Sequence, residues 1–216
     1  LATFNESGIT APAYAVTKHY DIQHPNDDLE TVTFVDGFGR AVQVKKDGVV
    51  TSASKGNSAK DENVMIVSGR NVYDAFGRVA KAFYPTTEGT GSKSTFNKSF
   101  DNVSPTVTVY DVLDRATSVT LPDNSTTTTA YTVDNGSHAL VTTVTDALHN
   151  VQATHTNGSG KTLKTIQKSG PDGEITTSFE YDGIQRLVRV TDTEGNVTTS
   201  TYDMGDRRTE VNHPAS

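Results

Sequence analysis

A short motif recurs along this chain, and its recurrence limits the possible folds more than any other feature. Each copy is Tyr or Val followed by Asp, with Arg four residues after the Asp: VDGFGR (35–40), YDAFGR (73–78), YDVLDR (110–115), YDGIQR (181–186) and YDMGDR (202–207). The Asp residues are spaced by 38, 37, 71 and 21 residues, and TDALHN (145–150) lies near the middle of the longest gap as a degenerate copy. Such recurrence is typical of repeat proteins, whose units bury their apolar faces by stacking on one another.

The segments between the motifs have the pattern of β-strands. RAVQVKK (40–46), RATSVTLP (115–122) and RLVRVTD (186–192) alternate apolar or β-branched residues with polar ones, which is the period of a half-buried strand. Further turn residues lie between the motifs, as in PDN (122–124) and PDG (171–173). We therefore predict an all-β fold of stacked β-hairpins that form an extended antiparallel sheet.

Three regions depart from the repeat. Residues 1–30 contain no copy of the motif and are interpreted as a leading segment, and residues 31–216 as the repeat array. Polar insertions at about 51–63 and 85–105 are predicted to be surface loops at hairpin tips. A linker between two domains is the alternative, but the repeat continues on both sides, which favours one continuous array.

Each motif can be explained as a turn between two strands. The Tyr ring can pack on the sheet while the Asp carboxylate accepts hydrogen bonds from backbone N–H groups just after it. Gly39 and Gly77 can adopt the left-handed conformation of a tight turn, and Asp114 and Asp206 occupy that place in two other copies. The Arg can reach the Asp or a carbonyl of the neighbouring turn. The residues assigned to these turns are Asp36, Gly39, Arg40, Tyr73, Asp74, Gly77, Arg78, Tyr110, Asp111, Arg115, Tyr181, Asp182, Arg186, Tyr202, Asp203 and Arg207.

Composition excludes several classes of protein. The formal charge of −7 and the lack of a long Lys/Arg cluster argue against nucleic-acid and anionic-membrane partners. No apolar run is long enough to span a bilayer. The absence of Cys excludes disulfides and thiolate metal sites and agrees with export. An apolar fraction of 33% without Trp predicts a thin core.

The recurring YDxxGR motif, with turns such as TDTEGN (191–196), resembles the RHS or YD-repeat family over residues 30–216. The segment PAYAVTKHYDIQHPNDDLETVTFVDGFGRAVQVKKDG (12–48) is similar to the region that introduces the repeats in Tc-toxin B-component and SpvB-like exported bacterial proteins. The resemblance implies a curved sheet that forms part of a larger shell around a toxic C-terminal polypeptide, although adhesion proteins of animals also belong to the family. The self-cleavage block DxxGxxDPxG of toxin members is absent.

Other candidate sites are weaker. His19 and His24, and His149 and His155, are near one another in sequence, but separations of five and six residues along a strand are too long to share an ion. The oxygen-rich turns DNVSP, PDNS, VDNGS and PDGE do not match a known calcium loop. Nucleophile motifs, facing carboxylate pairs and a phosphate-binding loop are also absent. We therefore predict no catalytic residue, no metal and no cofactor, and we interpret the protein as a non-enzyme.

The predicted function is structural. Because the chain opens with Leu1 and has no terminal signature, we expect it to be part of a larger secreted or cell-surface bacterial protein. Its expected partners are the remaining repeats of that protein and an enclosed cargo polypeptide. The alternative is a glycan-binding adhesion module that uses exposed aromatic residues, against which the Tyr residues of the motif are interpreted as core.

Overall fold

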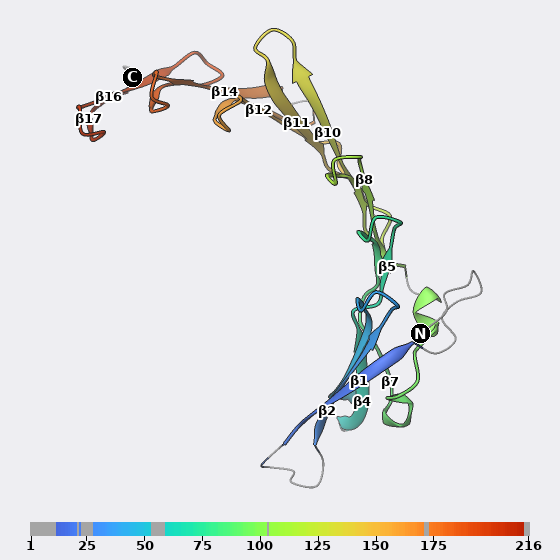
Figure 1. The fold of residues 1–216 in the computed structure, drawn as a ribbon. Helices are drawn as coiled ribbons and strands as arrows, with labels where there is room; N and C mark the ends of the chain where they lie inside the picture. The colour runs from blue at the N-terminus through green and yellow to red at the C-terminus, as the bar shows by residue number, and fades with distance from the viewer. Residues whose placement is uncertain are drawn as a thin grey trace. The chain divides into compact units, whose positions relative to one another are not determined.

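The computed structural model describes residues 12–20, 22, 28–52, 59–102, 104–170 and 173–213. In these ranges the regular structure consists of antiparallel strands and two short 3₁₀ turns, which confirms the all-β prediction (Figure 1). The leading residues 1–11, the tip at 53–58, Asp27, His24, Pro214 and the Pro-Asp of the PDG turn lie outside the described residues. The chain divides into two compact units, residues 1–108 with 120–124 and residues 109–119 with 125–216.

The first unit contains a five-stranded antiparallel sheet with the order β1-β2-β3-β4-β7. Its strands are β1 (Ala13–His19), β2 (Leu29–Val35), β3 (Ala41–Ser52), β4 (Lys60–Ser68) and β7 (Thr86–Gly89). The same unit holds the short hairpin of β5 (Asn71–Tyr73) and β6 (Val79–Ala82). The first motif copy joins β2 to β3, and the second joins β5 to β6, so both lie at hairpin corners.

One face of the five-stranded sheet is the core of the first unit. Val32 and Phe34 of β2 pair with Lys45 and Gln43 of β3, so these four side chains share a face, and all four are buried. Met65 and Val67 extend this face onto β4. The burial of every second residue of β2 follows from the alternation of side chains along a strand.

The segment predicted as a loop at 85–105 instead covers this buried face. It contains β7 and two 3₁₀ turns, η1 (Thr90–Ser92) and η2 (Ser99–Asn102). The Phe96 ring packs on Phe34 with 5.6 Å between ring centroids, and the backbone N–H of Asn97 donates to Oε1 of Gln43 at 2.8 Å. The polar composition of the segment led to its prediction as a loop. Its role could not be predicted from local sequence, because its contacts are with residues far away in the sequence.

The predicted loop at 51–63 is also shorter than its composition indicated. Thr51 and Ser52 belong to β3, residues 60–63 belong to β4, and the two strands pair as far as Ser52 and Lys60. Polar residues continue these strands because the sheet extends here beyond its buried part: residues 49–52 and 60–63 are exposed.

The second sheet contains β5, β6 and β8–β17 in sequence order. Its later strands are β8 (Thr106–Tyr110), β9 (Ala116–Thr120), β10 (Thr126–Asp134), β11 (Ala139–Thr145), β12 (Val151–Thr156), β13 (Thr162–Lys168), β14 (Glu174–Tyr181), β15 (Leu187–Thr191), β16 (Val197–Tyr202) and β17 (Arg208–Asn212). From β10 to β17 each strand pairs antiparallel with the next. The second unit is therefore a chain of consecutive hairpins.

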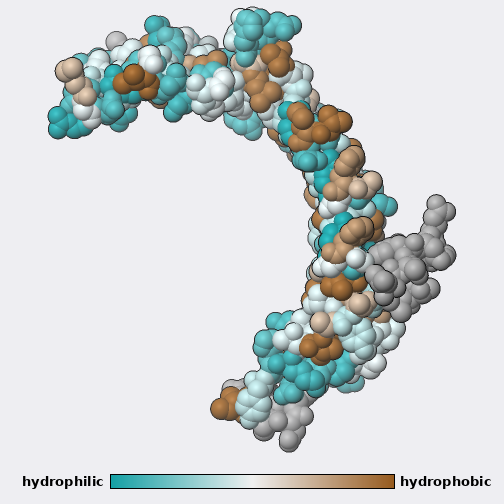
Figure 2. Space-filling model, viewed as in Figure 1, coloured by the Kyte–Doolittle hydropathy of each residue, from teal (hydrophilic) through white to brown (hydrophobic). Residues whose placement is uncertain are grey.

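The second unit has a very thin core. Ala139, Val141 and Ala153 are its buried apolar residues in the described part of the chain, and most other apolar side chains are half-buried or exposed. Figure 2 shows the same property on the face in view, where small brown patches are separated by polar and neutral residues. Local contacts between neighbouring strands must therefore supply much of the stability of this unit.

The corners of the second unit form two rows, because successive turns of antiparallel hairpins lie at opposite ends of the strands. The first row contains the corners at 111–115, 134–138, 157–161, 182–186 and 203–207. The second row contains those at 146–150 and 192–196 and the turn before β14. The repeat is thus one hairpin, and neighbouring first-row corners are 21 to 25 residues apart, as the numbers Asn157, Asp182 and Asp203 show.

This arrangement corrects the sequence-based placement of the degenerate copy. TDALHN at 145–150 joins β11 to β12 and belongs to the second row, as does TDTEGN at 191–196. The first-row corners in the same gap begin at Asp134, between β10 and β11, and at Asn157 in NGSGK, between β12 and β13. The number of residues between motif copies cannot predict this assignment, because it does not show at which end of a strand each turn lies.

Candidate functional site

The motif residues build a corner with the same backbone hydrogen bonds in every copy. The N–H of the first residue donates to the carbonyl of the residue four positions later, and the N–H of the fourth residue donates back to the first carbonyl. At Asp182 both distances are 3.0 Å, to Arg186 and from Gln185. The same pair of bonds occurs at corners that begin with Asp36, Asp74, Asp111, Asp146, Asn157, Asp182, Asp192 and Asp203.

The side chain of the first residue closes the corner. Oδ1 of Asp36 accepts the N–H groups of Phe38 at 2.8 Å and Arg40 at 2.9 Å, and Oδ2 accepts Nε of Arg40 at 2.6 Å. The other Asp-Arg copies, Asp74 with Arg78, Asp111 with Arg115, Asp182 with Arg186 and Asp203 with Arg207, have the same Nε–Oδ2 bond at 2.7 to 2.8 Å. The carboxylate thus satisfies three donors that a tight turn would otherwise leave without partners.

Asn replaces Arg in the second-row corners. Nδ2 of Asn150 donates to Oδ2 of Asp146 at 2.8 Å, and Nδ2 of Asn196 donates to Oδ2 of Asp192 at 2.9 Å. The Asp-Arg corners and these two Asp-Asn corners therefore share a geometry and differ in the residue that closes it. A sequence search restricted to Arg at this position cannot find the second row.

The fourth residue of each corner adopts the left-handed conformation. Its φ is +78° at Gly39 and +83° at Gly77, and +61° at both Asp114 and Asp206. Gln185 also has a positive φ, of +69°, although its side chain has no special tolerance for this conformation. His149 is in the same position with a φ of +65°. The position in the corner, more than the residue type, therefore determines the conformation.

Replacement of Gly77 by Val is expected to lower the free energy of unfolding by about 1 kcal/mol or more, because a β-branched residue is strained at positive φ. An added Cβ would also lie 3.2 Å from Nη1 of Arg40. Gly77→Asn is the matched control, since it adds the same Cβ but tolerates this conformation. Urea unfolding followed by circular dichroism measures the difference, and equal stability of the two variants would contradict the explanation.

Four Tyr residues, Tyr73, Tyr131, Tyr181 and Tyr202, link their hairpins to the preceding corner. In the second unit, the hydroxyl of Tyr202 donates to the carbonyl of Leu187 at 2.8 Å, and the Arg186 guanidinium lies 4.9 Å from the centre of its ring. Tyr181 makes the same hydrogen bond to Thr162 at 2.9 Å, with the Lys161 ammonium 6.0 Å from its ring centre. The acceptor is in each case the residue directly after the basic residue of the preceding corner.

The same pair of contacts, from a Tyr hydroxyl to a carbonyl and from its ring to a cation, occurs twice more. In the first unit of the chain, Tyr73 donates to Ala41 at 3.0 Å and Arg40 lies 4.1 Å from its ring centre. In the second, Tyr131 of β10 donates to Ala116 at 3.4 Å, with Arg115 at 3.9 Å. Tyr131 precedes no Asp directly, so the sequence motif did not identify it. Arg40, Arg115 and Arg186 thus each close their own corner and contact the ring of the next hairpin, and the Lys161 ammonium contacts the ring of Tyr181.

The corner carboxylates have pKa values below the ordinary value for Asp. Burial at Asp36 raises the pKa, but the backbone and side-chain donors of Arg40 and the N–H of Phe38 lower it by more. At Asp182 the N–H of Arg186 is the largest cause of the lowered pKa, and at Asp192 it is the side-chain amide of Asn196. The pKa is lowered at Asp36, Asp74, Asp111, Asp146, Asp182, Asp192 and Asp203.

Acid is therefore expected to destabilise the fold through these corners. A carboxylate whose pKa is lower in the folded than in the unfolded chain adds stability above its ordinary pKa of about 3.9, and this is lost as the pH falls through the folded value. The melting temperature should fall on acidification in this range, and less steeply for Asp182→Asn, because Asn157 shows that a corner can use an amide oxygen. A melting temperature that stays constant on acidification would contradict the prediction.

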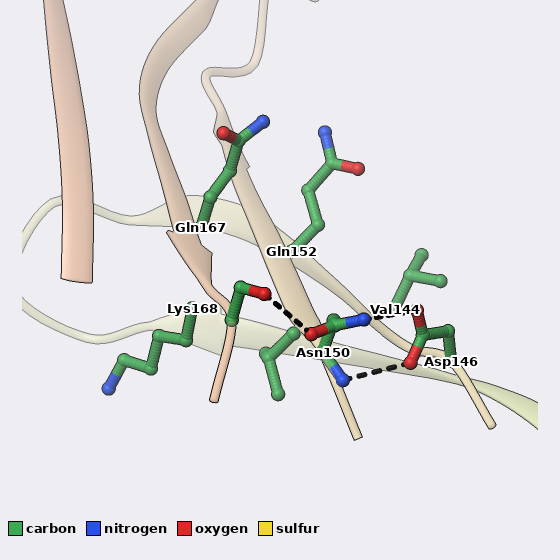
Figure 3. Close-up of a pocket in the computed structure, with 8 residues that line it drawn as sticks. Val144, Asp146, Asn150, Gln152, Gln167 and Lys168 are labelled. Atoms are coloured by element: carbon green, nitrogen blue, oxygen red, sulfur yellow. Dashed lines mark hydrogen bonds between the residues drawn. The ribbon is translucent and has the colours of Figure 1, made fainter. Parts of the chain in front are cut away.

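A shallow pocket of about 300 Å³ lies beside the second-row corner at 146–150. Figure 3 shows that Gln152 and Gln167 project from neighbouring strands, while Asn150 lies between Asp146 and the strand end near Lys168. The polar groups at its base bind one another: Nδ2 of Asn150 donates to Asp146, and Oγ of Ser169 donates to Oδ1 of Asn150 at 2.9 Å. These hydrogen bonds stabilise the corner, so the polar groups of Asp146, Asn150 and Ser169 bind one another.

A model of a domain of unknown function, DUF6443, matches residues 9–132. The chain belongs to the DUF6443 family. A second model, that of the RHS repeat, matches residues 181–216 of this DUF6443 chain. That match, together with the recurring corners, confirms the predicted resemblance to RHS or YD-repeat proteins. No curated protein sequence matches the chain.

Solved structures share the fold of the DUF6443 chain. The crystal structure of TcdB2-TccC3-TEV superposes with a TM-score of 0.59 at 16% identity, and the match covers 99% of this chain and 13% of that one. The crystal structure of TcdB2-TccC3 gives a TM-score of 0.58 at 16% identity, over 94% and 12% of the two chains. The DUF6443 chain thus spans about an eighth of the length of these relatives.

The remaining candidate sites of the DUF6443 chain do not come together in the part that the structure describes. Within those residues, no three His, Asp or Glu side chains lie close enough to hold a metal ion. His155 has its Nδ1 3.9 Å from Oδ2 of Asp134. No helix within the described ranges has the length and apolar character needed to cross a membrane.

Proposed function

We propose that this chain is a wall segment of a shell in a larger bacterial protein that is secreted or held at the cell surface, and that the shell encloses or presents a C-terminal effector polypeptide. The chain itself is a structural repeat segment with the fold of the TcdB2-TccC3 structures. Its expected partners are the remaining repeats of the same protein and the enclosed polypeptide.

The observation that carries this proposal is that the motif residues bind one another. The Asp of each described corner accepts donors of its own turn, and the Tyr residues of three motif copies bind the preceding hairpin. A catalytic or ligand site needs polar groups directed toward a substrate. Here the repeated polar groups stabilise the wall, in agreement with a non-enzymatic role.

The wall is also suited to extension. β17 is the last strand in the order of the second sheet among the described residues. The N–H and C=O groups on the outer side of such a strand can pair with a further strand. A hairpin of a following repeat would continue the sheet through the same ladder and the same corner contacts.

Limited proteolysis of the full parent protein tests the enclosure. The C-terminal polypeptide should resist protease in the native protein and become cleavable when the corners of this segment are weakened by Arg186→Ala with Tyr202→Phe. Lys81→Ala, on an exposed side chain of β6, is the control that should leave resistance unchanged. Equal cleavage of the C-terminal region in the native and corner-weakened proteins would reject the enclosure.

Glycan binding is a second candidate function, favoured by two exposed rings in the first unit. Phe38 is 85% exposed and Phe76 is 82% exposed, each at the tip of its corner with an Arg side chain over one side of the ring, Arg40 at 5.1 Å and Arg78 at 4.9 Å. Exposed aromatic rings can stack on sugars. A glycan array should then show binding that Phe76→Ala removes, and absence of binding by the folded chain would reject this candidate.

A further inference from the structure

The tip of the β10–β11 hairpin contains a reactive pair of residues that the corner function does not use. Asp134 and Ala139 form the last pair of the hairpin, so residues 135–138 make its turn. Asn135 and Gly136 are adjacent in this turn, and both are exposed to solvent. Gly imposes the least steric restriction on the backbone next to a reacting side chain.

The Asp134 carboxylate is directed at the backbone nitrogen that would react. Its Oδ1 accepts the N–H of Gly136 at 3.0 Å, and its Oδ2 accepts the hydroxyl of Ser137 at 2.6 Å. The Ser137 hydroxyl and the Gly136 N–H lower the pKa of Asp134, which keeps the carboxylate ionised at neutral pH. A base within hydrogen-bond distance of a nucleophile can take its proton as the new bond forms.

We propose that Asn135 is a site of self-modification by deamidation, with the Asp134 carboxylate as the base. The nitrogen of Gly136 attacks Cγ of Asn135 and gives its proton to Asp134. The Cγ–Nδ2 bond breaks, ammonia leaves with that proton, and a five-membered succinimide remains. Water then opens the ring at either carbonyl and leaves aspartate or isoaspartate at position 135.

The chain contains its own control for this inference, a second Asn-Gly pair at Asn157 and Gly158. Oδ1 of Asn157 accepts the N–H groups of Ser159 at 3.0 Å and Lys161 at 2.9 Å, which hold the side chain in its corner. A fixed amide cannot move readily into the geometry of attack, whereas a reaction of this kind depends on that approach. The same dipeptide is thus predicted to react at Asn135 and to be protected at Asn157.

The product changes the surface of the hairpin. Aspartate at 135 places a second negative charge next to Asp134, whose Oδ2 lies 3.9 Å from Nδ1 of His155. Isoaspartate adds a methylene group to the backbone of the turn and alters the position of Gly136 relative to Asp134. The tip of the hairpin therefore acquires a new charge and a new backbone path as the protein ages.

Peptide mapping by mass spectrometry, after incubation of the whole chain at neutral pH, tests the proposal. Asn135 is expected to convert at least about tenfold faster than Asn157, which corresponds to about 1.4 kcal/mol in the barrier. The two sites should approach each other in rate in denaturant, where the corner no longer holds Asn157. Equal rates in the folded protein, or no conversion at Asn135, would overturn the proposal.

Three variants test the role of the neighbours. Gly136→Ala should slow the conversion of Asn135, because the added side chain hinders the attack. Asp134→Asn should also slow it, whereas Ser137→Ala, which leaves Oδ1 and its bond to Gly136 in place, should have a much smaller effect. An unchanged rate in Asp134→Asn, with a circular dichroism spectrum like that of the parent chain, would overturn the role of the carboxylate as base.

Discussion

Replacement of Lys45 by Met is expected to lower the free energy of unfolding of the first unit by about 3 kcal/mol, because it removes a buried ammonium group and leaves the largely buried Glu88 carboxylate without its cation. Lys45 is 0% exposed and its ammonium group binds the Glu88 carboxylate. It also donates to the carbonyl of Ser92 at 2.8 Å and to that of Thr95. Met has a similar length and no polar atom to replace these bonds.

The consequence should be concentrated in the segment that covers the sheet. Lys45 and Gln43 of β3 together hold residues 88–97: Gln43 donates to the carbonyl of Asn97 at 2.9 Å, and Asn97 donates through Nδ2 to Glu88 at 2.8 Å. Loss of the ammonium group therefore removes the centre of one connected network. Hydrogen exchange should show increased opening of residues 90–98 before the rest of the unit.

Two controls separate charge from packing. Lys18 also binds a carboxylate, that of Glu30, but it is 59% exposed, and Lys18→Met should cost much less stability than Lys45→Met. The double variant Lys45→Met with Glu88→Met removes both charges and should recover part of the lost stability, since a buried pair can be replaced by apolar residues. Unchanged urea unfolding in Lys45→Met would contradict the role assigned to the network.

The corners were the part of the fold that local sequence could predict. Asp at the first position, a residue tolerant of positive φ at the fourth and Arg at the fifth all lie within one turn, so their chemistry can be deduced without knowledge of the rest of the fold. The strands were predictable for a similar reason, because alternation of polar and apolar residues is local. Gln185 shows the limit of this reasoning, since its positive φ follows only from the corner around it.

The contacts between hairpins were less accessible to sequence analysis. The Tyr of each motif was expected to pack on the sheet, and the identity of its acceptor depends on which hairpin lies beside it. Lys45 and Gln43 bind residues 43 to 54 positions away, and in sequence they look like the polar half of an alternating strand. Only the contacts with residues 88–97 explain why these polar side chains are buried.

Replacement of Asp36 by Ala is expected to cost about 3 kcal/mol, the second of the two large effects, because it removes three hydrogen bonds to a charged acceptor at a buried position. The Asp36 side chain is 1% exposed, and the donors left without it are the N–H groups of Phe38 and Arg40 and Nε of Arg40. Urea unfolding, with exchange of the β2 and β3 amides as the local measurement, reports the loss.

Asp203→Ala removes the equivalent three hydrogen bonds from a solvent-exposed corner. Comparison with Asp36→Ala therefore separates the effect of burial on stability from the effect of the turn geometry. Nε of Arg207 donates to Asp203 at 2.8 Å, but the Arg207 side chain is 85% exposed, so water can replace the lost partner. Its effect should be clearly smaller than that of Asp36→Ala, and Asp36→Asn should lie between them because it keeps Oδ1 as an acceptor. Equal losses for Asp36→Ala and Asp203→Ala would show that the turn alone, and not its burial against the first sheet, determines what each corner contributes.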